Sequence, residues 1–172
     1  MIVLIGMMGS GKSSIGRMLA RELGWRAVDL DREIEAAAGL SVAEIFATYG
    51  EARFRRYEEE ALLAMALRNQ PMVLSLGGGA VMSERGMQAL RARATRIVYL
   101  QAPIPELLRR LRRSPIRRPL LENSPDPAAR LAELLAVRRP LYERYADFAV
   151  DTHGKRLSAV AREILSRGGI CR

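Results

Sequence analysis

The sequence predicts an α/β fold in which helices cover both faces of a mostly parallel β-sheet. Short apolar runs alternate with longer stretches of helical spacing, and this alternation is typical of strand-helix-strand units. Several of the short runs are continuously hydrophobic, as expected of strands that are buried on both faces. The chain has 172 residues, of which 49% are hydrophobic, and this is enough apolar material for one core. We therefore expect residues 1–172 to form a single domain.

Five apolar runs of strand length are the expected strands of this sheet. Turn residues or charged residues flank most of them, as is typical of strands in α/β folds. The runs are residues 2–5, 27–30, 72–76, 97–100 and 148–150.

The stretches between the strands carry helix start and stop signals. Ser41 followed by Glu44 has the pattern of a capping box, and Ser83 marks another start. Gly24 and Gly39 are typical of the position after a helix ends. Helices are predicted for residues 12–23, 32–38, 42–48, 51–68, 83–92, 104–112, 127–145 and 157–166.

Positive charge is concentrated in one segment. Residues 109–118 contain six arginines and no acidic residue, whereas the whole chain has 28 Lys and Arg against 19 Asp and Glu, a net charge of +9. This balance favours anionic partners. Four prolines interrupt this basic segment and the residues just after it, at positions 115, 119, 125 and 127. We therefore expect a basic loop or lid at about residues 112–127 rather than a regular element.

Composition argues against several classes of protein. No apolar run approaches the roughly 18 residues of a membrane span, and residues 2–5 are typical of a core strand rather than a signal peptide. We expect a cytoplasmic protein with no membrane partner. The single cysteine, Cys171, excludes a disulfide framework within one chain.

Residues 6–13 match the phosphate-binding loop pattern G-x-x-x-x-G-K-[ST] at every fixed position, between a predicted strand and a predicted helix. The glycines let main-chain amides surround phosphates, and the helix N-terminus adds a favourable dipole. Lys12 is expected to bridge the outer phosphates of ATP, and the Ser13 hydroxyl to ligate Mg²⁺. The expected nucleotide-binding residues are Gly9, Ser10, Gly11, Lys12, Ser13 and Ser14.

Asp29 and Asp31 are expected at the C-terminal end of the second strand, with both carboxylates on one side. α/β folds bind ligands at this edge. One carboxylate can hold metal-bound water while the other orients a hydroxyl group for phosphoryl transfer. The alternative is that Asp31 caps a helix beginning at residue 32 and that Asp29 is a solvated strand end.

Arg55 and Glu58 lie three residues apart in a predicted helix, so that Glu58 can hold the Arg55 guanidinium as a bidentate partner for a substrate carboxylate. A surface ion pair is the alternative interpretation.

Three consecutive glycines, Gly77, Gly78 and Gly79, follow the third predicted strand. They allow close backbone approach to a small substrate, although a permissive loop without a ligand is the alternative. No aspartate ends this strand, and Asp29 is therefore expected to supply the second metal contact, through water.

Six sequence blocks, in order along nearly the whole chain, resemble the shikimate kinase family. They are G-M-M-G-S-G-K-S at 6–13, D-x-D at 29–31, F-R-x-x-E at 54–58, the triple glycine at 77–79, R-P-L-L at 118–121 and R-x-P-L-Y at 138–142. The resemblance implies a three-layer fold like that of nucleoside monophosphate kinases, with a five-stranded parallel sheet and a mobile lid. It also implies Mg²⁺-dependent transfer of the ATP γ-phosphate to the 3-hydroxyl of shikimate, in aromatic amino acid biosynthesis.

The resemblance implies a role for each matching residue. Asp31 would orient or deprotonate the acceptor hydroxyl, Arg55 and Arg138 would hold the shikimate carboxylate, and Gly78 would contact a ring hydroxyl through its backbone. Arg118 would move in with the lid to reach the phosphates.

The resemblance leaves the residue beside the adenine open. Lys155 occupies the place where relatives often have arginine, and Arg156 or an arginine among residues 110–113 are alternatives.

Other functions remain as alternatives. A related gluconate or nucleotide kinase would share the phosphate-binding loop, whereas a GTPase is disfavoured because neither Asn69 nor Asn123 lies in an N-K-x-D sequence. A basic nucleic-acid-binding protein would suit the net charge, but an aromatic content of 5% argues against stacking on single strands. We expect a monomer that binds ATP and shikimate and no nucleic acid.

Overall fold

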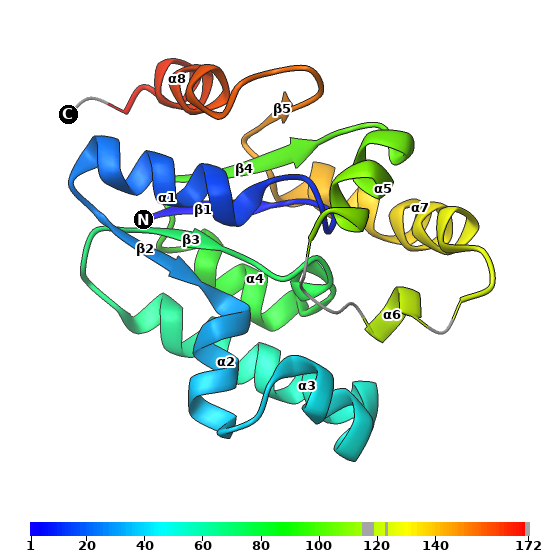
Figure 1. Ribbon diagram of the computed structural model, residues 1–172. Coiled ribbons are helices and arrows are strands. Elements are labelled where there is room, and N and C mark those ends of the chain that lie inside the picture. The colour runs from blue at the N-terminus through cyan, green and yellow to red at the C-terminus, as the bar shows by residue number, and fades with distance from the viewer. Residues whose placement is uncertain (115–118, 123, 171–172) are drawn as a thin grey trace.

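The computed structural model describes residues 1–114, 119–122 and 124–170. The elements follow in the order β1 (Ile2–Ile5), α1 (Lys12–Leu23), β2 (Arg26–Asp29), α2 (Leu30–Ala38), α3 (Val42–Leu67), β3 (Met72–Ser75), a 3₁₀ turn η1 (Ala80–Met82), α4 (Glu84–Arg91), β4 (Arg96–Gln101), α5 (Ile104–Arg112), α6 (Pro119–Glu122), α7 (Pro127–Tyr145), β5 (Phe148–Asp151) and α8 (Leu157–Gly168). Helices cover both faces of one sheet (Figure 1), which confirms the predicted α/β architecture.

The five strands form one parallel sheet in the order β2-β3-β1-β4-β5. After β1 the chain builds β2 and β3 on one side, and then β4 and β5 on the other. Open α/β sheets bind ligands beside the carboxyl ends of the strands, at the point where the strand order reverses. The loop that follows β1 therefore lies where a ligand is expected.

The side chains of β1 show why a continuous apolar run predicted a strand buried on both faces. Ile2 and Leu4 pack into a cluster with α1 and α8 on one face of the sheet. Val3 and Ile5 pack on the other face, in the cluster that also contains side chains of α3, α4 and α7. All four side chains are fully buried, and each contributes about 1.5–3 kcal/mol of hydrophobic stabilisation.

The junction of β2 and α2 differs from the prediction. The strand ends at Asp29 and the helix begins at Leu30, two residues before the expected start. Asp29 is the N-cap of α2, and its Oδ1 accepts a hydrogen bond from the Asp31 amide at 3.2 Å. The interpretation of Asp31 as the helix cap is therefore wrong, and strand alternation does not relate the two carboxylates. Asp31 instead lies in the first turn of α2, where the helix dipole favours a negative charge.

α3 contains the two helices predicted at 42–48 and 51–68, joined at a kink. The kink is at Gly50, whose φ of 76° and ψ of 174° are not helical and fall in a backbone region that is essentially restricted to glycine. The predicted capping box is confirmed: the Ser41 hydroxyl accepts from the Glu44 amide at 3.2 Å, and the Glu44 carboxylate accepts from the Ser41 amide at 2.7 Å. The other predicted helices differ from the structure by at most two residues at either end.

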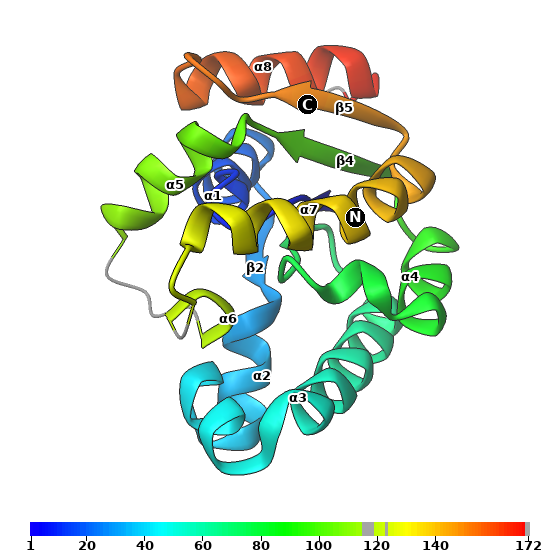
Figure 2. The same ribbon diagram turned by 90° about the vertical axis from the view of Figure 1, so that its right-hand side faces the viewer.

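The side of the molecule that carries the carboxyl ends of the strands also carries α5, α6 and α7 (Figure 2). Residues 119–122 of the lid expected at 112–127 lie here and form the short helix α6, so the expectation of an irregular segment is wrong for those residues. Residues 115–118 and 123 of that segment lie outside the described residues. Pro119 opens α6, a position at which a missing amide proton costs nothing. Within the described residues, no helix combines the length and the apolar character that a membrane crossing requires.

Candidate active site

Two adjoining hollows lie at the carboxyl edge of the sheet. The first, here called the α1 cleft, surrounds the loop between β1 and α1 and extends to α5 and the start of α8. The second, the α3 pocket, lies between the start of α2, α3 and α7. They share a wall formed by Met8, Ser13, Asp29, Asp31, Gly77 and Gly78. Ligands in the two hollows would therefore meet at this wall.

The phosphate-binding loop has the backbone conformation that its glycines allow. Gly9 and Gly11 have φ of 81° and 96°, which side-chain-bearing residues rarely adopt. The first turn of α1 leaves amides without partners inside the helix, and these amides are suited to binding an anion. Lys12 is 8% exposed, and its Nζ lies 2.8 Å from the carbonyl oxygens of both Gly6 and Met7. The ammonium group is thus held against the loop in which the phosphates of ATP are expected to bind.

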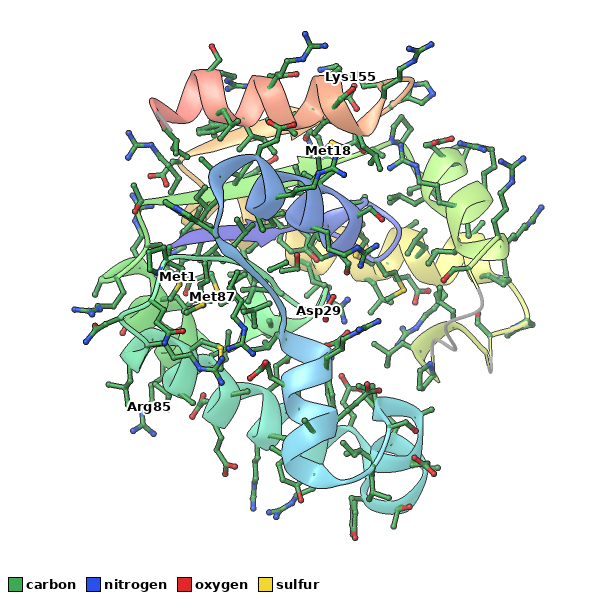
Figure 3. The ribbon with its side chains drawn as sticks, turned by 60° about the vertical axis from the view of Figure 1, so that its left-hand side comes forward. Met1, Met18, Asp29, Arg85, Met87 and Lys155 are labelled. Carbon is green, nitrogen blue, oxygen red and sulfur yellow. The ribbon has the colours of Figure 1, made fainter. Side chains whose placement is uncertain are left out.

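Ser13 and Asp29 bring two hard oxygen ligands together. The Ser13 hydroxyl donates to Asp29 Oδ2 at 2.6 Å, and Figure 3 shows Asp29 where β2 passes into α2. Mg²⁺ prefers such ligands and commonly takes only one or two from the protein, the others being water and substrate phosphates. In the described part of the chain, no group of three or more His, Cys, Asp or Glu side chains could hold a metal unaided. The donor pair fits Mg²⁺ brought in with a phosphate.

Arg55 and Glu58 form the predicted pair. Arg55 Nη1 donates to Glu58 Oε2 at 2.7 Å, while Nε and Nη2 donate to Glu51 Oε1 at 3.2 and 2.8 Å. Glu58 is only 1% exposed and both members of the pair line the α3 pocket, so the alternative of a surface ion pair is wrong. Burial raises the pKa of Glu58, and Arg55 opposes that rise.

Arg138 is a second arginine in the α3 pocket, and it is 4% exposed. Burial lowers the pKa of its guanidinium. Its Nη1 lies 4.0 Å from Met7 Sδ, and no carboxylate among the described residues forms an ion pair with it. A buried cation without a paired anion is costly, so this guanidinium favours an anionic ligand.

The three glycines after β3 lie among these charged groups. A Cβ atom at Gly77 would lie 2.9 Å from both Asp31 Oδ1 and Glu58 Oε1, and one at Gly79 would overlap the Arg55 guanidinium. All three glycines line the α3 pocket. Their lack of side chains therefore makes room for the site, which argues against a merely permissive loop.

The far end of the α1 cleft contains two of the residues suggested for base binding. Lys155 lines it and pairs with Glu163 at 2.7 Å; Figure 3 shows Lys155 just before α8. Arg110 lines it as well, with Nη2 donating to the Thr152 carbonyl at 2.8 Å. Arg156, Arg112 and Arg113 are not among the residues that line the cleft. Arg118 lies outside the described residues.

Several lining residues escaped the sequence reasoning. Phe46 and Val42 form an apolar wall of the α3 pocket together with Phe54 of the F-R-x-x-E block, and Leu157, 42% exposed, contributes an apolar surface to the α1 cleft. Their helical spacing is equally typical of core residues, so periodicity could not single them out. Exposure at the start of α8 would have been the signal for Leu157, and exposure is known only once the chain is folded.

The chain is similar to known proteins over most of its length. The family model described as shikimate kinase matches residues 8–168. Shikimate kinase from Mycobacterium tuberculosis is 49% identical over 165 residues, which cover 96% of this chain and 91% of that protein. Shikimate kinase from Bordetella pertussis is 45% identical over 166 residues, covering 96% and 77%.

Solved structures with a similar fold include a shikimate kinase and a gluconokinase. Shikimate kinase from Acinetobacter baumannii in complex with shikimate superimposes with a TM-score of 0.91 at 36% identity, over 96% of this chain and 90% of that one. A gluconokinase from Sinorhizobium meliloti, at 19% identity and a TM-score of 0.58 over 98% and 90% of the two chains, shares the fold alone.

Proposed function

The chain belongs to the shikimate kinase family and is an ATP-dependent kinase. From this premise we propose that it transfers the γ-phosphate of ATP to the 3-hydroxyl of shikimate, producing shikimate 3-phosphate and ADP. The proposed place of transfer is the wall shared by the α1 cleft and the α3 pocket. One observation carries this assignment. A phosphate-binding loop and a pocket with two arginines meet at a wall that contains Asp31.

The nucleotide binds in the α1 cleft under this proposal. Main-chain amides from Gly9 to Ser14 surround the phosphates, and Lys12 contacts the outer ones. Ser13 and Asp29 would hold Mg²⁺, Asp29 through water, and the ion would neutralise charge on the phosphate oxygens when bound. The adenine lies at the far end, where Lys155, Arg110 and Leu157 line the cleft.

Shikimate binds in the α3 pocket with its carboxylate on Arg55 and Arg138. Both guanidinium groups line this pocket, and Arg138 has no acidic partner among the described residues. Glu58 and Glu51 hold Arg55 in place through three hydrogen bonds. A fixed guanidinium binds a carboxylate in bidentate fashion at little further cost in side-chain entropy. Backbone amides of Gly77, Gly78 and Gly79 are the donors available to the ring hydroxyls.

Asp31 is the proposed group beside the reacting hydroxyl. The acceptor oxygen attacks the γ-phosphorus, its proton passes to the Asp31 carboxylate, and the bond to the β-phosphate oxygen breaks. Lys12 offsets the charge that develops on the phosphate oxygens. Arg118 is proposed for the same task on the basis of its sequence position.

A coupled assay of ADP release tests the acceptor. Shikimate should support turnover, whereas gluconate and nucleoside monophosphates should not. Gluconate is the informative competitor because it also carries a carboxylate. Turnover with gluconate and none with shikimate would refute the proposal. We further propose a cytoplasmic monomer without nucleic-acid binding; light scattering on the purified protein and titration with mixed oligonucleotides at physiological salt would test the last two points.

A further inference from the structure

Tyr142 is a completely buried residue of α7 whose hydroxyl donates to the Gly78 carbonyl, with an O–O distance of 2.5 Å. Its ring stacks on that of Tyr99 in β4, with the centroids 4.9 Å apart and the planes at 25°. Burial raises the pKa of the Tyr142 hydroxyl, so the group stays protonated at neutral pH. The donor is therefore fixed in position and always available.

The middle carbonyl of the glycine loop depends on this donor. The Gly77 carbonyl accepts from the Ala80 amide at 3.2 Å, and the Gly79 carbonyl accepts from the Met82 amide at 2.9 Å. The Gly78 carbonyl has no main-chain donor among the described residues, and the Tyr142 hydroxyl is its one donor there. Glycine has wide backbone freedom. Among the described residues, the hydrogen bond from Tyr142 is therefore the one hydrogen bond to the Gly78 carbonyl that sets the orientation of the Gly78–Gly79 peptide.

The orientation of that peptide decides where an amide proton points. No cis peptide occurs in the described residues, and in a planar trans peptide the C=O and N–H groups point in opposite directions. With the Gly78 oxygen held by Tyr142, the Gly79 N–H points away from Tyr142. Gly79 lines the α3 pocket, and its amide has no acceptor among the described residues.

We propose that Tyr142 is a positioning residue for the acceptor: its hydroxyl fixes the Gly78–Gly79 peptide so that the Gly79 N–H is presented to an oxygen atom of the bound substrate. The inference rests on the proposed function, since the substrate is the acceptor of that reaction. It adds a residue that touches no ligand but determines the direction of a donor that does.

The test is Tyr142→Phe, with Tyr145→Phe as the matched control. Tyr145 lies on the same helix, is 8% exposed and makes no hydrogen bond through its hydroxyl within the described residues. We expect Tyr142→Phe to raise the KM for shikimate by about 5-fold or more, as for the loss of an oriented hydrogen bond. The KM for ATP should change by less than about 2-fold. Tyr145→Phe should leave both constants unchanged.

Thermal unfolding and a double-mutant cycle separate the possible causes. If Tyr142→Phe lowers the melting temperature but leaves the KM for shikimate unchanged, Tyr142 is structural only and the proposal is overturned. Arg138 lies one turn before Tyr142 and interacts with it, so the substitution is repeated in an Arg138→Lys background. If Tyr142→Phe still raises the KM for shikimate in that background, Tyr142 acts through the Gly78–Gly79 peptide, as proposed. If the rise in KM disappears, Tyr142 acts through Arg138 and the proposal is overturned. A wild-type enzyme inactive on shikimate would instead refute the proposed function, and this inference with it.

Discussion

The Ser13 hydroxyl donates to Asp29 Oδ2 at 2.6 Å, which joins the first turn of α1 to the end of β2. These two residues lie on strand and helix ends that are 16 positions apart in the chain. The contact places a helix terminus suited to phosphates next to a carboxylate suited to a metal. It therefore connects nucleotide binding with the proposed metal requirement.

Replacing Asp29 should weaken the dependence on Mg²⁺ in a measurable way. Asp29→Asn is expected to raise the Mg²⁺ concentration for half-maximal activity by about 10- to 100-fold, as when a group that orients metal ligands is lost. The control is Asp151→Asn, because Asp151 also ends a strand and accepts a hydrogen bond from the amide two residues on, but lies outside both hollows. Equal Mg²⁺ titrations for the two variants would contradict the assignment of Asp29.

Asp31→Asn should separate chemistry from nucleotide binding. Loss of the proton acceptor is expected to reduce kcat by about 10²- to 10⁴-fold, while the Kd for ATP, measured by calorimetry, stays within about 2-fold. Lys12→Ala should impair both, because the ammonium group contacts the phosphates in the ground state as well. Near-normal turnover by Asp31→Asn would show that another group takes the proton.

Arg138→Met should stabilise the ligand-free protein and weaken the binding of shikimate. Arg138 is buried and has no acidic partner among the described residues, so removing its guanidinium is expected to raise the melting temperature of the ligand-free protein by about 2–4 °C, which corresponds to about 1 kcal/mol in a domain of this size. The KM for shikimate should rise by about 30-fold or more, because a charge-assisted hydrogen bond is lost.

Arg139→Met is the control for the melting temperature and the KM of Arg138→Met. Arg139 is the next residue on α7 and pairs with Glu143 at the surface. A surface ion pair contributes little, so neither quantity should change much. A lower melting temperature for Arg138→Met would mean that the guanidinium stabilises the fold, and it would contradict the assignment of Arg138 as a binding site for an anionic ligand.

Glu58 should make the stability of the ligand-free protein fall as pH rises. Burial raises the pKa of Glu58 above the ordinary glutamate value of 4.5, even though Arg55 opposes the rise. Below pH 4.5 the carboxyl is protonated in both states and its contribution is fully present; as pH rises through the raised native pKa, the unfolded chain ionises first and the contribution is lost. Melting temperatures between pH 4 and 8 should therefore decline more in the wild type than in Glu58→Gln. Parallel profiles would argue against a perturbed Glu58.

The junction of β2 and α2 shows where the sequence was ambiguous. Two aspartates separated by one residue suit either a strand end or a helix cap. A shift of two residues in the start of the helix made Asp29 the cap and left Asp31 facing both hollows. Local sequence could not decide the shift, because Leu30 is compatible with either element and its burial in the hydrophobic core is a tertiary property.

The sequence by itself determined the strands, most helix limits, the phosphate-binding loop and the capping box at Ser41, because each depends on residues close together in the chain. Only the tertiary structure decided that Arg138 is buried without an acidic partner among the described residues and that Tyr142 holds the Gly78 carbonyl. These contacts join Arg138 to Met7 across 131 positions and Tyr142 to Gly78 across 64. A propensity or a periodicity carries no information over such separations, since the packing of α7 against the sheet creates those contacts.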